Sequence, residues 1–295
     1  MAFLGTDHDG TLLLDPTDII VAEGGAALPA DVDAFADAAG TSQTIDPDAL
    51  NAVAGNVTLQ ATNNININDA ISLDTNGASF TAQAGRNITV DASISTSNGA
   101  ILLSAGDAGG PGVAGAALNG GATLNSGGAD ITLQNTRSGG IALDRNVNAG
   151  AGTVRMFTDN GGAITQATTS RITAGALGVI ADGPVTFRSD LPTTPHNNVG
   201  TFAAQVTGAG NEVSYTDRHP SGQQTLTIGS VTTLGGTLFT GATGITTDNG
   251  NVTVTAGKII QVDNPIAAGS GVIGLRTTED ISPTANIVLN ANVSS

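Results

Sequence analysis

The sequence has no cysteine, no tryptophan and only one tyrosine among its 295 residues. The absence of cysteine excludes disulfide and thiol chemistry and is compatible with export into an oxidising environment. Aromatic residues make up 3% of the chain, too few for the bulky core of an ordinary globular enzyme. Glycine accounts for 41 residues, yet 39% of the chain is hydrophobic, which argues against disorder. The composition therefore predicts a thin, continuous core of Ile, Val, Leu and Ala.

Positive charge is also scarce. Lys and Arg total 9 against 25 Asp and Glu, and Lys258 is the only lysine, which gives a net charge of −16. Nucleic acids and anionic membranes bind clustered basic residues, so neither is an expected partner. No apolar run reaches the roughly 18 residues that span a bilayer, so we expect no membrane insertion. The first ten residues lack the basic and apolar regions of a signal peptide, and we expect none here.

A tandem repeat occupies residues 55–99. Sliding one copy over the next by 23 residues places Gln60 on Gln83 and Ile71 on Ile94. The same shift superposes Ala61 on Ala84, Asn64 on Asn87, Ile65 on Ile88 and Ile67 on Val90. Apolar residues alternate with small polar ones in three short bursts per copy, which is the period of β-strands. Because one such coil cannot bury its apolar side alone, it must stack on another in register.

The chain is therefore predicted to be an all-β, right-handed parallel β-helix, or β-solenoid, with about 22–23 residues per coil. Residues 55–295 would give roughly eleven coils, and a spacing of about 4.8 Å gives a rod on the order of 50 Å long. Register is expected to persist from Ile131 to Val154 and from Val154 to Leu177, each 23 residues apart.

Three regions are expected along the chain. Residues 1–23 contain short N-terminal strands, residues 24–54 form an Ala- and Asp-rich lateral excursion, and residues 55–295 form the solenoid. Within the excursion, Asp46 and Pro47 are predicted to be the N-cap and first residue of a short helix that carries Leu50 and Val53. Loop insertions are expected in the solenoid near 107–128 and 189–224, where glycine or proline accumulates. Binding residues, if present, would lie in these excursions at 24–53, 107–128 and 189–224.

Several long phrases resemble the repeat region of filamentous haemagglutinin-family exoproteins. They are GTLLLDPTDIIV, TSQTIDPDALNAVAGNVTLQATNNI, FTAQAGRNITVDASIST, NNVGTFAAQVTGAGNEVSYTD, TLTIGS and GITTDNGNVTVTAG. The resemblance covers most of the chain and implies a right-handed β-helix from a large bacterial adhesin of two-partner secretion. It further implies an outer-membrane secretion partner and an extracellular or outer-surface location. The secretion domain of that family is not visible in this sequence.

Candidate catalytic residues are scattered. His8, His196 and His219 lie far apart without metal-ligand spacing, so they are expected to be loop residues. A polysaccharide-active β-helix would need acidic and basic side chains that converge on one sheet face. The available pairs are Asp144 with Arg145, Arg155 with Asp159, and Arg188 with Asp190. Nine basic residues spread along the chain do not favour convergence, so we predict no catalytic residues and no enzymatic activity.

Ligand sites are equally sparse. Asp7, Asp9 and Gly10 form a DxDG fragment that lacks the remaining oxygen ligands of an EF-hand loop. We therefore predict no metal-ligating and no cofactor-binding residue. Calcium stays the one ion to test. Sugar platforms use exposed aromatic rings, and Tyr215 is the single Tyr or Trp available. The aromatic residues Phe80, Phe187 and Phe202 alternate with polar residues and are predicted to be core. Chance explains the N-x-S/T sequons at Asn56, Asn87, Asn251 and Asn292 in so Asn-rich a chain.

Three functions stay open. The first is a non-enzymatic adhesin stalk that supports binding to a host or neighbouring-cell surface. The second is an extracellular filament subunit that self-associates end to end, because the last coil at 270–293 has no evident cap and unpaired strands template further pairing. The third is a polysaccharide-active enzyme. The repeat and the resemblance favour the stalk hypothesis.

Overall fold

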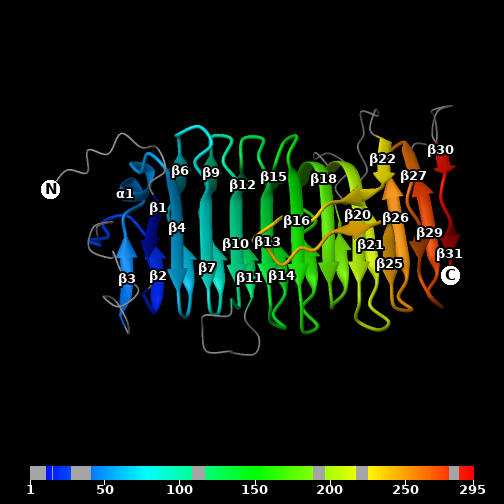
Figure 1. Cartoon of the computed structure of the whole chain (residues 1–295), viewed down its shortest axis with the longest axis horizontal. Coiled ribbons are helices and arrows are strands. Elements are labelled where there is room, and N and C mark those ends of the chain that lie inside the picture. The colour runs from blue at the N-terminus through cyan, green and yellow to red at the C-terminus, as the bar shows by residue number, and fades with distance from the viewer. Residues whose placement is uncertain are drawn as a thin grey trace.

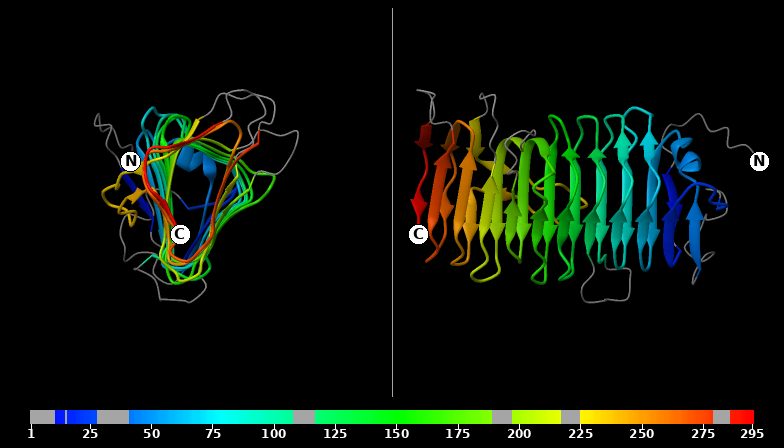
Figure 2. Two further views of the ribbon diagram at one scale, coloured as in Figure 1. Left: turned by 90° about the vertical axis from the view of Figure 1, so that its right-hand side faces the viewer. Right: turned by 180° about the vertical axis from the view of Figure 1, so that it is seen from behind.

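In the computed structural model, the chain folds as a β-solenoid of about 10 turns with about 24 residues per turn. The structure describes residues 11–14, 16–27, 41–107, 117–188, 197–216, 225–278 and 286–295. Parallel strands of successive turns lie side by side along the axis, and the end-on view shows a triangular cross-section (Figures 1 and 2). The predicted parallel β-solenoid is confirmed. Its mean turn is slightly longer than predicted because some steps contain extra residues, such as the 30 that separate Ser104 from Gln134.

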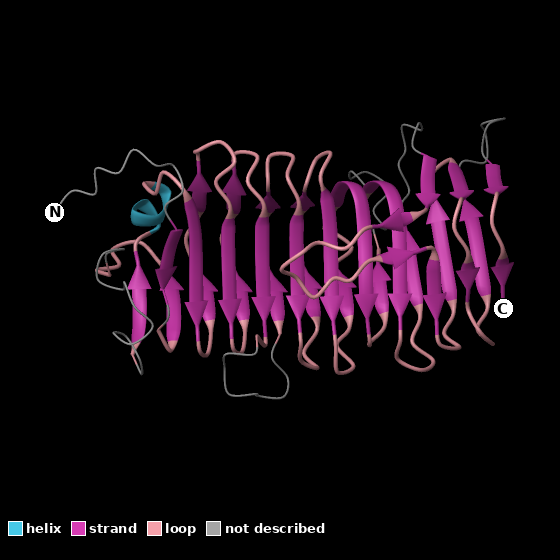
Figure 3. Cartoon of the chain, viewed as in Figure 1, coloured by secondary structure: helices cyan, strands magenta, loops and turns pink. Residues whose placement is uncertain are grey.

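Three faces make up the triangle, and strands dominate all of them (Figure 3). Two long strands, β18 (Ile172–Ala181) and β20 (Asn198–Val206), turn through a corner and contribute to both the third and the first face. The first face also contains β1 (Thr11–Leu14), β4 (Asn56–Ala61), β7 (Phe80–Ala84), β10 (Ile101–Ala105), β13 (Ile131–Asn135), β16 (Thr153–Thr158), β25 (Ile245–Thr247), β28 (Ile266–Ala267) and β31 (Val293–Ser294).

The second face contains β3 (Ser42–Ile45), β2 (Asp18–Val21), β5 (Ile65–Ile67), β8 (Ile88–Val90), β11 (Leu118–Gly120), β14 (Ile141–Leu143), β17 (Ile164–Gln166), β19 (Val185–Phe187), β21 (Val213–Thr216), β26 (Val252–Ala256) and β29 (Ile273–Thr277). The third face contains β6 (Ile71–Leu73), β9 (Ile94–Thr96), β12 (Leu124–Asn125), β15 (Val147–Asn148), β22 (Thr225–Ile228), β27 (Ile259–Val262) and β30 (Asn286–Leu289). One helix, α1 (Pro47–Asn51), and an antiparallel pair, β23 (Ser230–Val231) with β24 (Ala242–Thr243), complete the described elements.

Like side chains stack on one another both in the core and on the outer side of the strands. Gln60 pairs with Gln83, Ile65 with Ile88 and Ile71 with Ile94, which confirms the predicted repeat register. Ile131 pairs with Val154, and Val154 with Leu177, so the register does survive the longer step before β13. One inward column of the first face runs through Val57, Phe80, Ile101, Ile131, Val154, Leu177 and Phe202, all buried. Burial of each such side chain contributes about 1.5–3 kcal/mol to stability.

The Asn-Gly corners stack as well. Asn98 Nδ2 donates a hydrogen bond to Asn76 Oδ1 of the preceding turn at 2.9 Å. Asn98 itself adopts a left-handed backbone with φ of 58°, a conformation that asparagine tolerates better than most residues. A Cβ on Gly99 would lie 1.7 Å from the Ala78 carbonyl oxygen. Only glycine therefore allows the two corners to approach this closely.

At the N-terminal end, α1 lies within the triangular outline of the stack (Figure 2). Asp46 is the N-cap and Pro47 begins the helix, as the sequence predicts, and Asp46 Oδ1 accepts a hydrogen bond from Asp48 N at 2.9 Å. Leu50 is fully buried in the main core. Among the described residues no third-face strand precedes β6, and α1 occupies that position.

The first two strands belong to the same stack. β1 pairs with β4, and β2 pairs with β5 on one edge and with β3 on the other. Asn51 Oδ1 accepts a hydrogen bond from Ser72 N on β6 at 2.8 Å, which satisfies a donor on the N-terminal edge of the third face. The segment 41–53 therefore covers the N-terminal end of the solenoid, while residues 28–40 of the predicted excursion lie outside the described residues.

Candidate functional site

The outward side of the first face carries a polar ladder along its N-terminal half. Gln60 Nε2 donates to Gln83 Oε1 at 2.6 Å, and Gln83 Nε2 donates to Asp107 Oδ2 at 3.2 Å. Ser104 Oγ also donates to Asp107 Oδ2, at 2.8 Å, and Gln134 Nε2 donates to Ser104 Oγ at 3.0 Å. The ladder arises because strand register places Gln60, Gln83, Ser104 and Gln134 directly over one another.

The same outward column becomes apolar in the next turns. Gln134 pairs with Phe157, and Phe157 pairs with Ile180. The adjacent outward column changes in parallel, from Arg155 to Gly178 to Ala203. The outward residues Arg155, Ile180 and Ala203 are buried, although a strand on a solvated face buries only its inward residues.

Residues 229–244, called the strap from here on, cover this apolar region. The strap leaves the stack between β22 and β25, contains β23 and β24, and extends back across β20, β18 and β16 towards β13 (Figure 1). Phe239 is fully buried there, in a second hydrophobic cluster separate from the main core. Its members are Ile180, Ala203, Val231, Phe239 and Ala242, with Phe157 and Ala176 packed against them.

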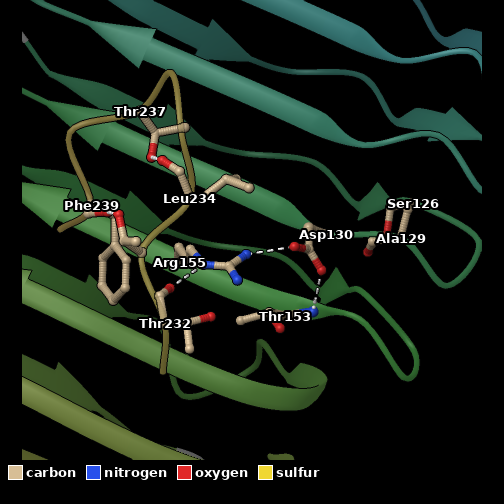
Figure 4. A network of polar contacts seen from close by, with 10 residues as sticks. Ser126, Ala129, Asp130, Thr153, Arg155, Thr232, Leu234, Thr237 and Phe239 are labelled. Carbon is tan, nitrogen blue, oxygen red and sulfur yellow. Dashed lines mark hydrogen bonds and ion pairs between the residues drawn. The ribbon is translucent and has the colours of Figure 1, made fainter. Parts of the chain in front are cut away.

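The tip of the strap is held by polar contacts. Leu238 N donates to Gln134 Oε1 at 3.0 Å, so the polar ladder ends on the strap. Arg155 is only 6% exposed, and its Nε donates to the Thr232 carbonyl at 3.1 Å (Figure 4). Its Nη1 pairs with Asp130 Oδ2 at 2.5 Å. Both charges of this ion pair therefore lie at the margin of the strap.

Arg155, a candidate partner of Asp159 in the sequence, is paired with Asp130 instead. Asp130 lies opposite Thr153 in the ladder, and Thr153 and Arg155 share the outward side of β16, so Asp130 is a diagonal neighbour of Arg155. Asp159 lies four residues further along the chain, about 13 Å away in an extended strand.

The other two candidate acid–base pairs are not assembled into a site in the described residues. Arg145 Nη1 contacts the backbone carbonyl of Asp144 at 3.1 Å, not its carboxylate. Arg188 follows β19 on the second face, and Asp190 lies outside the described residues. Asp7, His8, Asp9, His196 and His219 also lie outside them. Within the described ranges, no three His, Asp or Glu side chains are close enough to hold a metal ion together.

The predicted loop insertions coincide partly with regular structure. In 107–128, β11 and β12 are ladder strands, and residues 108–116 lie outside the described ranges. In 189–224, β20 and β21 are ladder strands, and residues 189–196 and 217–224 are not described. Residues 231–243, which form most of the strap, were expected to belong to the regular solenoid, and no insertion was predicted there.

Four of the described aromatic residues lie in the main core. Phe80, Phe187 and Phe202 are fully buried, as predicted, and so is Tyr215. Tyr215 stacks on Phe202 with ring centroids 4.7 Å apart, and Phe187 meets both rings edge-on at 6.3 Å. The one tyrosine is therefore part of the packing of the stack and is not an exposed ring on which a sugar could lie.

Three of the four sequon asparagines have a structural role that the sequence did not reveal. Asn56 Oδ1 accepts a hydrogen bond from Ser79 N, Asn87 Oδ1 from Ala117 N and Asn251 Oδ1 from Val272 N, each at 2.9 Å. Each of these bonds joins a residue at the start of one strand to the next turn. The asparagines thus extend the backbone ladder by one side-chain rung.

The last described turn of the stack exposes apolar side chains. Val262 and Ile266 are fully buried, but the residues that continue their columns, Leu289 and Val293, are 57% and 36% exposed. Val272 is 71% exposed nearby. A shallow apolar surface results, lined by Ile273, Leu275, Ile287, Leu289 and Val293. Two surfaces thus depart from a plain stack: this apolar surface of the last turn and the strapped first face.

No protein-family model, no curated protein and no solved structure matches this chain. The resemblance to filamentous haemagglutinin-family exoproteins therefore stays a prediction. Within the described residues, no helix has the length and hydropathy required to cross a bilayer.

Proposed function

We propose that this chain is a non-enzymatic structural segment of a bacterial secreted or surface adhesin, in which the β-solenoid is a rigid stalk that supports adhesion. The observation that carries the proposal is the unbroken register of the first face. A single column of buried side chains runs from Val57 to Phe202 through seven turns, and hydrogen-bonded strands accompany it throughout. Inter-turn hydrogen bonds of this kind lie along the axis of the rod.

The exterior supports the same proposal. Side chains such as Gln60, Gln83 and Asn98 bond to the equivalent side chain of an adjacent turn, so the outside of the rod reinforces the inside. Both layers resist bending and stretching, as a stalk requires. The phrases that resemble filamentous haemagglutinin-family proteins add the context: an outer-surface or extracellular location, an outer-membrane secretion partner, and a host or neighbouring-cell ligand.

Immunogold labelling of intact producing cells tests the location and the role together. An antibody against the solenoid should label unbroken cells, and purified chain should appear as straight rods of roughly 50 Å by electron microscopy, since about ten strands are spaced by about 4.8 Å. Labelling that requires cell lysis would overturn the surface assignment. Turnover of an acidic polysaccharide by the purified chain would replace the stalk with an enzyme.

The exposure of Val272 and Leu289 favours a second candidate, a subunit that associates through the end of its solenoid. At every earlier turn the equivalent surface is covered by a following β-coil, so a further coil of the same kind is the occupant that fits. The N-terminal end is covered by α1 and β3, and growth from head to tail would have to accommodate this cover. Association is therefore favoured at one end more than at the other.

Sedimentation of the purified chain across a concentration series tests this second candidate. Leu289→Lys places a charge in the apolar end and should weaken self-association at least about tenfold, or about 1.4 kcal/mol. Thr253→Lys is the matched control, because Thr253 is exposed on the side of the rod and the substitution adds the same charge. A wild-type chain that stays monomeric at all concentrations, or equal effects of both variants, would exclude the end as the interface.

A further inference from the structure

The strap connects turns that a solenoid does not otherwise connect. In a stack of coils each turn contacts only its neighbours, so unfolding can begin at an end and proceed turn by turn. The strap breaks this rule, because the hydrogen bond from Leu238 N to Gln134 Oε1 joins residues 104 apart in the sequence. The bond from Arg155 Nε to the Thr232 carbonyl joins residues 77 apart.

The surface of the first face is complementary to the strap. Gly178 lies beneath it, and a Cβ at this position would come within 2.5 Å of Phe239 Cζ and 2.7 Å of Val231 Cγ1. Phe157 and Ile180 stand in a column that is polar in the preceding turns, at Gln83 and Gln134. The strap and the face beneath it are thus complementary in both shape and polarity.

The polar margin allows the strap to lift without breaking the turns. Arg155 has one partner on the strap, the Thr232 carbonyl, and one on the stack, Asp130. Asp130 in turn accepts a hydrogen bond from Thr153 N at 2.8 Å. When the strap lifts, water can replace the Thr232 carbonyl while the ion pair stays in place.

We propose that the strap is a latch that makes the turns from β13 to β20 open as one cooperative unit instead of turn by turn. The latch holds through Phe239 and Val231 on the apolar face and through Gln134 and Arg155 at its margin. The latch would act in the same way whether or not the chain is an adhesin stalk, since it affects only how the stack opens.

Hydrogen exchange followed by mass spectrometry on the full chain tests the latch. In the wild type, amides of β13, β16, β18 and β20 should exchange through one shared opening. Phe239→Ala removes the apolar anchor, and the protection of β18 and β20 should then fall at least about tenfold relative to β13. The amides of β4 and β7, which lie beyond the reach of the strap, should keep their protection.

Gly178→Ala provides a second variant with the strap sequence intact, because the added methyl pushes against Phe239 and Val231 from below. Its matched control is Gly274→Ala in β29, where a Cβ would meet nothing within 4 Å. The latch predicts that Gly178→Ala reproduces the exchange pattern of Phe239→Ala and that Gly274→Ala does not.

Faster exchange of the strap amides alone, with β13 to β20 unchanged in both strap variants, would overturn the proposal and leave the strap as a passive cover. If Phe239→Ala fails to fold, as shown by loss of its far-ultraviolet circular dichroism, Gly178→Ala decides between these two outcomes.

Discussion

The two ends of the solenoid present the same kind of coil to different surroundings. At the N-terminal end, Leu50 of α1 is fully buried against the core, and β3 pairs with the edge of β2. At the C-terminal end, Leu289 occupies a core column but is 57% exposed. The difference shows that a coil does not bury its own apolar interior. The apolar interior of a coil is buried only when another coil or a separate element packs against it. At the N-terminal end the five-residue helix α1 is enough to do this.

Replacing one leucine at each end should give the largest difference in stability between the two ends. Leu50→Ala deletes a fully buried side chain and should lower the free energy of unfolding by about 2–5 kcal/mol. Leu289→Ala deletes a half-exposed side chain of the same type and should cost less than about 1 kcal/mol. Thermal and denaturant unfolding of the two purified variants measure both effects. Equal losses would mean that the ends are equally well packed.

A smaller effect is expected from the cap of α1. The two Asp46 carboxylate oxygens accept hydrogen bonds from Asp48 N and Gly24 N, each at 2.9 Å. Asp46→Ala should therefore destabilise the N-terminal end by about 0.5–2 kcal/mol. The neighbouring Asp48→Ala alters an exposed side chain and should change stability by no more than about 0.5 kcal/mol. Faster amide exchange confined to residues 41–53 would locate the loss; an effect of Asp48→Ala as large as that of Asp46→Ala would contradict the role of the cap.

The pH dependence of stability should also involve the N-terminal end. Burial alone would raise the pKa of Asp18, but hydrogen bonds from Ser42, Asn63 and Asn64 together outweigh it and lower the pKa below its ordinary value of 3.8. A carboxylate with a depressed pKa in the folded state stabilises the fold at pH above its unfolded value. This contribution is lost as the pH falls through the lower, folded-state pKa. Asp18→Asn should therefore flatten the acid limb of a plot of melting temperature against pH, and an unchanged limb would refute the assignment.

At the C-terminal end, Asp263 should have the smallest effect on the pH dependence of stability. Hydrogen bonds from Asn290 and Gln261 lower the pKa of Asp263 below 3.8, with the same sign of pH dependence as Asp18. Asp263 is exposed, so solvent screens its interactions and the effect on global stability should be slight. Titration followed by NMR of the Asp263 carboxyl carbon checks the direction of the shift. A pKa above 3.8 would show that the Asn290 and Gln261 contacts do not persist in solution.

Sequence reasoning succeeded where like residues stack. Gln60 over Gln83 and Ile71 over Ile94 could be aligned because a strand register, once set by one identical pair, fixes every other pair in the turn. The helix at Asp46 and Pro47 was also predictable, because an N-cap followed by proline is a local signal. The strand register was predictable from a constant period, and the helix start was predictable from residues adjacent in the chain.

The strap could not be predicted by the same means. Its partners, Gln134 and Arg155, lie 104 and 77 residues away, and no period relates them to Leu238 and Thr232. The strands beneath the strap do contain a sequence signal that their outer side is covered. Phe157 and Ile180 place apolar side chains on the outward side, where a solvated strand would carry polar ones. Such a loss of alternation indicates that something covers the outer face, but it does not say which segment.

The strap also restricts how this rod can change length over evolutionary time. Duplication or loss of one coil between β4 and β10 would shift everything beyond it together and leave the strap in place. A coil gained between β13 and β20 would move Gln134 about 4.8 Å from Leu238 and place a new residue beneath Phe239. The strapped turns should therefore keep a fixed number in related proteins, while the unstrapped turns are free to multiply.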